Sequence, residues 1–258
     1  MPPLNQTDSL SGSDLSGKDF GAGLTFEETD IQGTGIRKIR TEPLQAEFVF
    51  ISPGEFVMGD GGERHRVILT KGFFMQTTPV TQRQWKEMAG SNPSQFRDCD
   101  DCPVETVSWD DVNEFVILLN RKAGTDRFRL PTEAEWEYAC RAGSETAYCF
   151  GDDHRHLGKY AWFDRNSGEK THPVAQKKPN AWGLYDMHGN VCEWCQDWYD
   201  YYSEMTVTDP VGDSSGYRRI FRGGSWKFDA QRSRSAYRGR VYPDTRHPVL
   251  GFRLVLMS

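Results

Sequence analysis

The sequence contains no long apolar run and no dense cluster of Lys and Arg. No stretch approaches the roughly 20 apolar residues that cross a bilayer, and the N-terminus lacks the basic flank and apolar core of a secretory signal. The formal net charge is −6, which disfavours a groove that follows nucleic-acid phosphates. These absences predict a cytoplasmic protein that binds neither a membrane nor nucleic acid.

Cysteine is absent after Cys195, so the C-terminal segment carries no thiol. Two CxxC pairs occur earlier, Cys99 with Cys102 and Cys192 with Cys195. A four-cysteine zinc site requires that the fold bring both pairs together. The alternative is that the second pair packs in a Trp-rich core while the first braces a loop. In a cytoplasmic protein we expect thiols rather than disulfides.

Glycine and aromatic residues are plentiful, with 25 Gly, 8 Trp, 10 Tyr and 15 Phe. This composition is typical of aromatic side chains held by tight loops rather than by long helices. Residues 1–43 are rich in Ser, Gly, Asp and Thr, and we expect a flexible N-terminal tail there. Residues 44–258 are long enough to bury the core of one domain.

Three helices are predicted from capping residues and apolar spacing. Thr81 with Gln84, and Thr132 with Glu135, have the spacing of a capping box, and Ser108 precedes an apolar repeat at helical spacing. The helices are expected at about 82–89, 109–122 and 133–143. Short β-strands are expected at about 48–51, 54–59, 66–69, 73–75, 220–223, 234–237 and 252–256. Few helices among many strands and loops predict an α+β fold.

Ten motifs occur in order between residues 44 and 256. They are Pro79-Val-Thr81, Asn92-Pro-Ser94, Pro103-Val-Glu-Thr-Val-Ser-Trp109, Arg129-Leu-Pro-Thr-Glu-Ala-Glu-Trp-Glu-Tyr-Ala139, Asn180-Ala-Trp-Gly-Leu-Tyr185, Gly189-Asn-Val191, Glu193-Trp194, Asp197-Trp198, Arg222-Gly-Gly-Ser-Trp226 and Gly251-Phe-Arg253. Together the motifs resemble the formylglycine-generating enzyme, or sulfatase-modifying factor, family. The resemblance implies a C-type lectin-like fold, loop-rich with two or three helices. It does not by itself give the function, because one fold hosts many activities.

The resemblance implies an oxidase that holds copper between two cysteine thiolates. In the enzymes of this family, these cysteines lie a few residues beyond the Gly-Gly-Ser-aromatic motif. In this sequence the corresponding stretch, 227–237, contains no cysteine. We therefore expect no copper site and no catalytic residue there. The alternative is an oxidoreductase of the same type that uses non-standard cysteines, with Cys192 and Cys195 as candidates.

Histidine offers little support for another metal enzyme. Related iron enzymes of the family use three histidines supplied largely by an additional helical domain, for which this chain has no room. Only His154 and His156 lie close together in the sequence. We interpret them as a solvated loop pair.

A calcium loop is implied by the resemblance at 186–193. The family pattern gives carboxylate oxygens from Asp186 and Glu193 and backbone carbonyls from Gly189 and Val191. Hard oxygen ligands at this spacing suit Ca²⁺. The alternative, which stays open, is that Asp186 caps the turn and Glu193 pairs with an arginine.

Some cysteine-lacking members of the family are variable proteins of diversity-generating retroelements, which display a diversified ligand-binding face on a fixed frame. The resemblance implies such a face near the C-terminus, made by Trp226, Phe228, Arg232, Tyr237, Gly239, Arg240, Val241, Tyr242, Thr245, His247, Pro248 and Val249. Aromatic and Arg side chains on a loop are typical of recognition surfaces.

The sequence thus favours a non-catalytic domain that binds a protein or a small-molecule ligand at its C-terminal face. A further alternative is an adaptor whose N-terminal tail docks onto another protein. The sequence leaves the ligand and the oligomeric state open.

Overall fold

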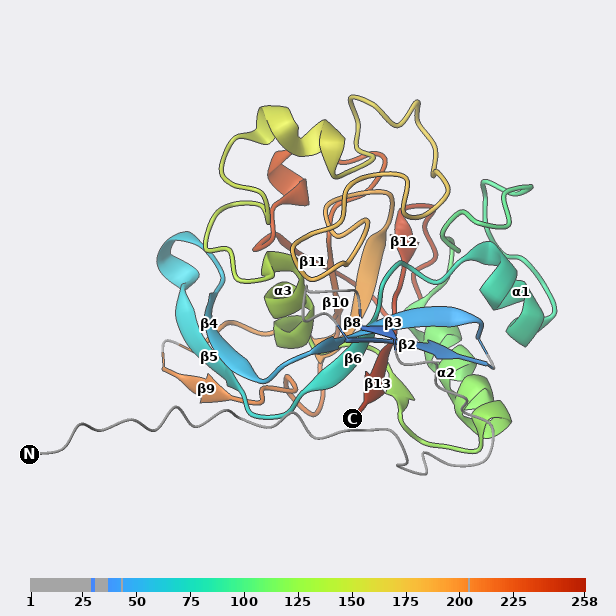
Figure 1. Ribbon diagram of the computed structural model, residues 1–258, viewed down its shortest axis with the longest axis horizontal. Helices are drawn as coiled ribbons and strands as arrows, with labels where there is room; N and C mark the ends of the chain where they lie inside the picture. Colours follow the sequence, from blue (N-terminus) through green and yellow to red (C-terminus); the bar gives the residue numbers. More distant parts are fainter. Residues whose placement is uncertain (1–28, 31–36, 43, 204) are drawn as a thin grey trace, which may run out of the picture.

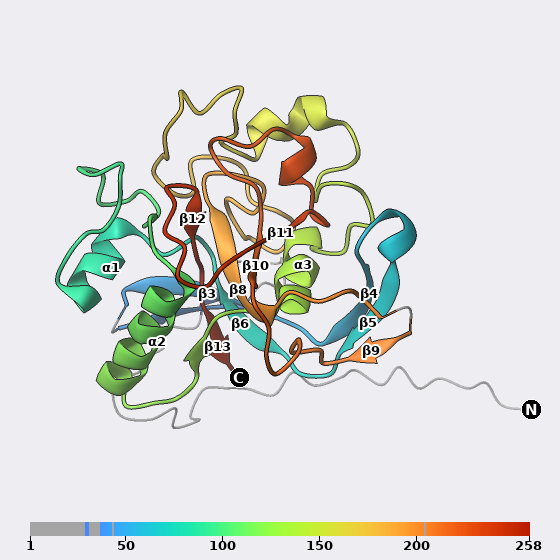
Figure 2. The same ribbon diagram turned by 180° about the vertical axis from the view of Figure 1, so that it is seen from behind.

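The computed structural model describes residues 29–30, 37–42, 44–203 and 205–258 (Figures 1 and 2). Within the expected tail 1–43, Arg37–Thr41 forms strand β2, which pairs with β3, so part of this segment belongs to the domain. Thr29–Asp30 (β1) and Glu42 are also described, and the other residues of that segment lie outside the described part. None of the helices described combines the length and hydropathy of a bilayer span.

Three sheets organise the chain. The six-stranded sheet has the order β1-β2-β3-β6-β13-β7 and adds β3 (Ala46–Ile51), β6 (Phe73–Gln76), β13 (Val255–Met257) and β7 (Phe128–Arg129) to the first two strands. The four-stranded sheet has the order β11-β10-β8-β12, made of β11 (Arg238–Val241), β10 (Arg219–Arg222), β8 (Cys192–Trp198) and β12 (Leu250–Gly251). The three-stranded sheet contains β4 (Gly54–Met58), β5 (His65–Leu69) and β9 (Val207–Thr208).

The three α-helices begin where the capping residues predict. Helices α1 (Gln82–Ala89), α2 (Trp109–Ala123) and α3 (Glu133–Arg141) start after Thr81, Ser108 and Thr132, and each has a complete capping box. Short 3₁₀ helices lie at η1 (Gly61–Glu63), η2 (His154–Lys159) and η3 (Gln231–Ser233). Helices α1 and α2 lie at one end of the molecule and the β4-β5-β9 sheet at the other, with η2 and η3 on a third side (Figure 1).

The predicted strand at 234–237 was wrong, because β11 begins four residues later, at Arg238. Arg234, Ser235 and Ala236 instead form a bend in which Ser235 and Ala236 turn their carbonyls toward Arg222. The predicted strand at 252–256 is also divided, since Phe252–Leu254 separate β12 from β13. The α+β architecture itself agrees with the prediction.

A buried network of ion pairs fixes α3 against the four-stranded sheet. The Arg222 side chain on β10 is fully buried and donates to Glu133 at 3.1 Å and to Glu137, both on α3. It also donates to the carbonyls of Ser235 at 2.8 Å and Ala236 at 3.2 Å. The residue therefore joins a helix, a strand and the bend that leads into β11.

Two further arginines complete this network. Arg238 binds Glu133 at 2.6 Å, and Arg141 binds Glu137 at 2.8 Å. Each acidic side chain of α3 in the network thus faces two guanidinium groups. Buried charges are tolerated when each has a partner, although Arg222 Nε has no acceptor among the described residues.

We expect Arg222→Met to lower the free energy of unfolding by about 3–5 kcal/mol, because two buried carboxylates lose their shared partner. The matched control is Arg246→Met, which breaks the exposed pair with Asp111 and should cost less than about 1 kcal/mol. Urea denaturation followed by far-UV circular dichroism measures both. Equal losses in the two variants would contradict a central role for Arg222.

Candidate ligand-binding site

Strand β11 divides the predicted C-terminal face into two groups. Side chains alternate along a strand, so Gly239 and Val241 lie on one face of the sheet and Arg238 and Arg240 on the other. Val241 packs against the core cluster that contains Phe115 and Trp194. The predicted residues therefore do not form one continuous surface.

The first group gathers around Phe228. Its ring lies edge-on to Tyr237, with centroids 6.4 Å apart, and the Arg232 guanidinium lies 5.3 Å above it. Phe228 and Tyr237 are half-buried and Arg232 is exposed. Phe221 on β10, which the sequence did not indicate, belongs to the same face because its ring covers Gly239. We call Phe221, Phe228, Arg232, Tyr237 and Val241, with Thr245, His247 and Pro248, the recognition face.

Three predicted contact residues prove to be framework. Trp226 is buried, stacks edge-on against Phe96 at 5.2 Å, and donates its indole N–H to the Pro248 carbonyl at 2.8 Å. Val249 is also in the core. A Cβ atom at Gly239 would stand 2.1 Å from the Phe221 ring, so this position is not open to substitution unless that ring moves.

Backbone hydrogen bonds hold the loop between β11 and β12. Thr106 donates its N–H to the His247 carbonyl at 3.2 Å, and Trp109 donates to the Pro243 carbonyl at 2.9 Å. Burial, together with nearby Lys227, lowers the pKa of His247. Thr245 and Pro248 are half-buried and His247 is exposed. The loop has a fixed path while these side chains remain partly accessible.

Arg240 and Tyr242 form the second group. The Arg240 guanidinium lies 3.8 Å above the ring of Tyr199, and the Arg218 guanidinium lies 5.1 Å above the ring of Tyr242. Tyr199 packs against the other core cluster, the one that contains Trp136 and Cys195. Sequence reasoning missed Tyr199 and Arg218, because only the β8-β10-β11 register brings them to Arg240 and Tyr242.

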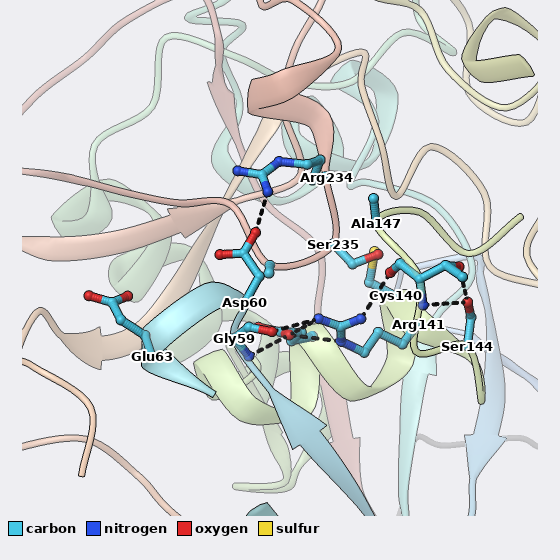
Figure 3. Close-up of polar contacts among 12 residues, drawn as sticks. Gly59, Asp60, Glu63, Cys140, Arg141, Ser144, Ala147, Arg234 and Ser235 are labelled. Carbon is cyan, nitrogen blue, oxygen red and sulfur yellow. Dashed lines mark hydrogen bonds and ion pairs between the residues drawn. The ribbon is translucent and has the colours of Figure 1, made fainter. Parts of the chain in front are cut away.

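Below the bend that precedes β11, charged side chains surround a cavity of about 220 Å³. Figure 3 shows Arg234 pairing with Asp60, and Arg141 directed toward Gly59. Arg141 donates to Glu137 at 2.8 Å and to the Gly59 carbonyl at 3.1 Å. Arg141 and Arg234 are thus engaged within the protein and support the bend, and Arg64 also lines this cavity.

Three of the four free cysteines are buried, and Cys149 is half-buried. Cys99 and Cys102 form a disulfide, which corrects the expectation of thiols and removes two of the four cysteines that the predicted zinc site requires. Cys140, Cys192 and Cys195 are fully buried, and burial raises the pKa of all three, that of Cys140 to about 12. Cys192 and Cys195 pack in a Trp-containing core, as one alternative proposed.

The described residues contain no cluster of three His, Cys, Asp or Glu side chains placed for a metal ion. His154 and His156 are exposed on η2. Both side chains are accessible to solvent, as expected for a solvated pair.

The predicted calcium loop contains one unpaired acidic oxygen. Asp186 is buried; its Oδ2 accepts the Ala175 N–H at 2.8 Å, whereas Oδ1 has no hydrogen-bond donor in the described residues. Burial raises the pKa of Asp186 to about 6. An orphaned carboxylate oxygen in a buried turn is compatible with a bound cation.

Glu193 follows the alternative that the sequence left open. Its Oε2 accepts from Arg253 Nε and from the Trp136 indole, both at 2.7 Å, and its Oε1 accepts from Arg253 at 2.8 Å. Oε1 receives one hydrogen bond and so retains a lone pair. Glu193 is therefore chiefly a structural ion-pair partner.

The chain thus has a C-type lectin-like fold that contains the Arg222-Gly-Gly-Ser-Trp226 turn and a buried Glu193–Arg253 pair. The chain belongs to the sulfatase-modifying factor enzyme 1-like domain family, whose model matches residues 36–257. The resemblance found in the sequence motifs is thus confirmed, and the family match begins just before β2.

Individual relatives differ in how much of their length they share with this chain. The chain is 26% identical over 260 residues to the chaperone protein LppX of Paenibacillus barcinonensis, covering 81% of this chain and 89% of that protein. It is 40% identical over 168 residues to the formylglycine-generating enzyme of Streptomyces coelicolor, covering 58% of this chain and about half, 51%, of the enzyme. Among solved structures, Treponema denticola variable protein 1 has a TM-score of 0.79 at 29% identity, covering 90% of this chain and 99% of that one.

Proposed function

We propose that this protein is a non-catalytic binding domain that holds a protein or small-molecule ligand on its recognition face. The observation that carries the proposal is a thiol-free C-terminal loop whose accessible side chains are aromatic, basic and hydroxylic. Rigid aromatic rings supply contact area at a small entropy cost, and Arg supplies directional hydrogen bonds. The enzymatic relatives rely on thiolates, whereas burial raises the pKa of the three fully buried thiols here.

The similarity to variable protein 1 supports this function along most of the chain. The frame is held by buried contacts, chiefly the Arg222 network and the Trp226–Pro248 hydrogen bond. Side chains on the recognition face make few hydrogen bonds of their own. Their identity can therefore change with little effect on the backbone.

The binding face is tested with the double variant Phe228→Ala/Tyr237→Ala. Partners are captured from a lysate of the source cell, identified by mass spectrometry, purified and titrated by calorimetry. We expect the double variant to weaken the Kd at least tenfold, because two adjoining rings are removed, while the Tm falls by only a few degrees. The matched control is Tyr242→Ala, an exposed ring of the second group, which should change the Kd less than twofold. Loss of binding in Tyr242→Ala, with binding retained in the double variant, would contradict the assignment of the face.

We propose in addition that a retroelement diversifies the accessible positions of this face. Sequencing of the flanking genome should reveal a second copy of the final hundred or so bases beside a reverse transcriptase gene. That copy should carry adenines at the codons for Phe228, Arg232, Tyr237 and His247, and ordinary codons at buried Trp226. A genome without such a copy would remove diversification and leave the binding function untouched.

A structural Ca²⁺ is the proposed cofactor, held by Asp186 Oδ1, by the carbonyls of Gly189 and Val191, and by the remaining lone pair of Glu193 Oε1. The unpaired Asp186 oxygen is the feature that supports it. Copper has no comparable support, since the stretch 227–237 carries no thiolate.

We expect 1 mM CaCl₂ to raise the Tm by a few degrees relative to EDTA, because an ion bound at about 100 times its Kd stabilises by about 2.7 kcal/mol. The same concentration of MgCl₂ serves as the control and should have less effect. Asp186→Ala should abolish the calcium-dependent increment, whatever its own Tm. An unchanged Tm in the wild-type protein would leave Asp186 as a turn cap only.

A further inference from the structure

A second cavity lies apart from the recognition face. It has a volume of about 440 Å³ and is lined by the start of α2, the end of β8, residues 211–214 and Arg219 on β10. None of the eight residues of the recognition face lines it. The cavity is accordingly not explained by the function proposed above.

Arg219 lies at the wall of this cavity between aromatic rings. Its guanidinium carbon is 3.7 Å from the centroid of the Trp109 ring and 3.5 Å from that of Trp198. The Trp109 indole N–H donates to the Cys195 carbonyl at 2.9 Å, which fixes that ring. Arg219 in turn donates to the Gln196 carbonyl at 2.5 Å. The guanidinium is thus held in one position before any ligand arrives.

In the described part of the chain, this guanidinium has no carboxylate partner. Its Nε is buried without a hydrogen-bond acceptor, and Asp110 and Asp197 act on it only through longer-range attraction. Burial accordingly lowers the pKa of Arg219 to about 10. By contrast, the buried Arg222 and Arg253 both pair with glutamates. A partly buried cation without an anion is costly, so the missing anion is expected from outside the chain.

The rest of the cavity limits the shape of that anion. Val116, Leu130 and Val211 offer apolar walls, and the side chains of Asn113 and Ser214 offer hydrogen-bonding groups. Asp213 also lines the cavity; its pKa is raised by a side-chain hydrogen bond with Asp200. A negative charge on this rim disfavours ligands with several charges. The neighbouring Arg129 is already neutralised by Glu135.

The geometry points to a binding site for a single carboxylate attached to an apolar body, with the carboxylate at Arg219 and the apolar part along Val116, Leu130 and Val211. A free organic acid and the C-terminus of an apolar peptide share this chemistry. A neighbouring cavity of about 400 Å³ shares Arg129, Gln196 and Val211 with this one, which gives space for a longer ligand.

The test uses the full chain and four probes: 4-phenylbutyrate, its neutral amide, the peptide acetyl-Ala-Val-Leu-Phe with a free C-terminus, and the same peptide with a C-terminal amide. Binding is followed by the indole ¹⁵N–H signals of Trp109 and Trp198, with calorimetry for the Kd. We expect at least one acid to bind and to shift both indole signals, and its amide to bind at least tenfold more weakly. Preference for the small acid or for the peptide identifies the source of the carboxylate.

Two variants separate the site from the stability of the fold. Arg219→Gln should abolish acid binding, but it also removes a stacked side chain. Asn113→Asp adds a negative charge at an exposed position of α2 and should weaken acid binding at least tenfold with an unchanged Tm. The control is Glu114→Gln, a charge change at an exposed position of the same helix that does not line the cavity, and it should not weaken acid binding by more than threefold. The proposal is overturned if no acid binds below about 10 mM, if the amides bind equally well, or if Asn113→Asp has no effect.

Discussion

The fold depends on the pairing of Arg222 with Glu133 and Glu137 inside the protein. This guanidinium satisfies two carboxylates of α3 and two carbonyls of the bend before β11. Removing it would leave Glu133 and Glu137 with one guanidinium each in a buried site, which is more costly than the loss of an exposed pair. Because the bend sets the direction of β11, the same interaction decides which side chains reach the surface beyond it.

The two faces of the four-stranded sheet have separate environments as a result. One face carries Phe221, Phe228 and Val241 over the core cluster of α2, and the other carries Arg240 over Tyr199. A ligand on one face would not contact the other. Buried ion pairs, Arg222 with α3 and Glu193 with Arg253, hold the fold of this chain, which carries no cysteine after Cys195. Frame and chemistry are thus separable in this fold.

Local signals in the sequence predicted local structure well. The capping boxes at Thr81 and Thr132 placed α1 and α3 correctly, because the cap and the third residue of the helix are close in sequence. The strand expected at 234–237 failed, because the carbonyls of that segment bind Arg222 rather than a neighbouring strand. Two features depend on the register between distant segments and leave no signal in a short stretch of sequence. They are the division of the predicted face into two groups and the stacking of Arg219 on Trp109 and Trp198. The burial of Trp226 has the same cause, since its partners Phe96 and Pro248 lie in other loops.

The hydrogen bond from the Trp226 indole to the Pro248 carbonyl connects two loops that are far apart along the chain. With the backbone bonds at Pro243 and His247, it anchors the intervening segment at several points. Side chains on this segment can therefore be exchanged without a new folding problem at each step, and the yield of folded protein depends on the anchoring contacts rather than on the identity of the exposed side chains.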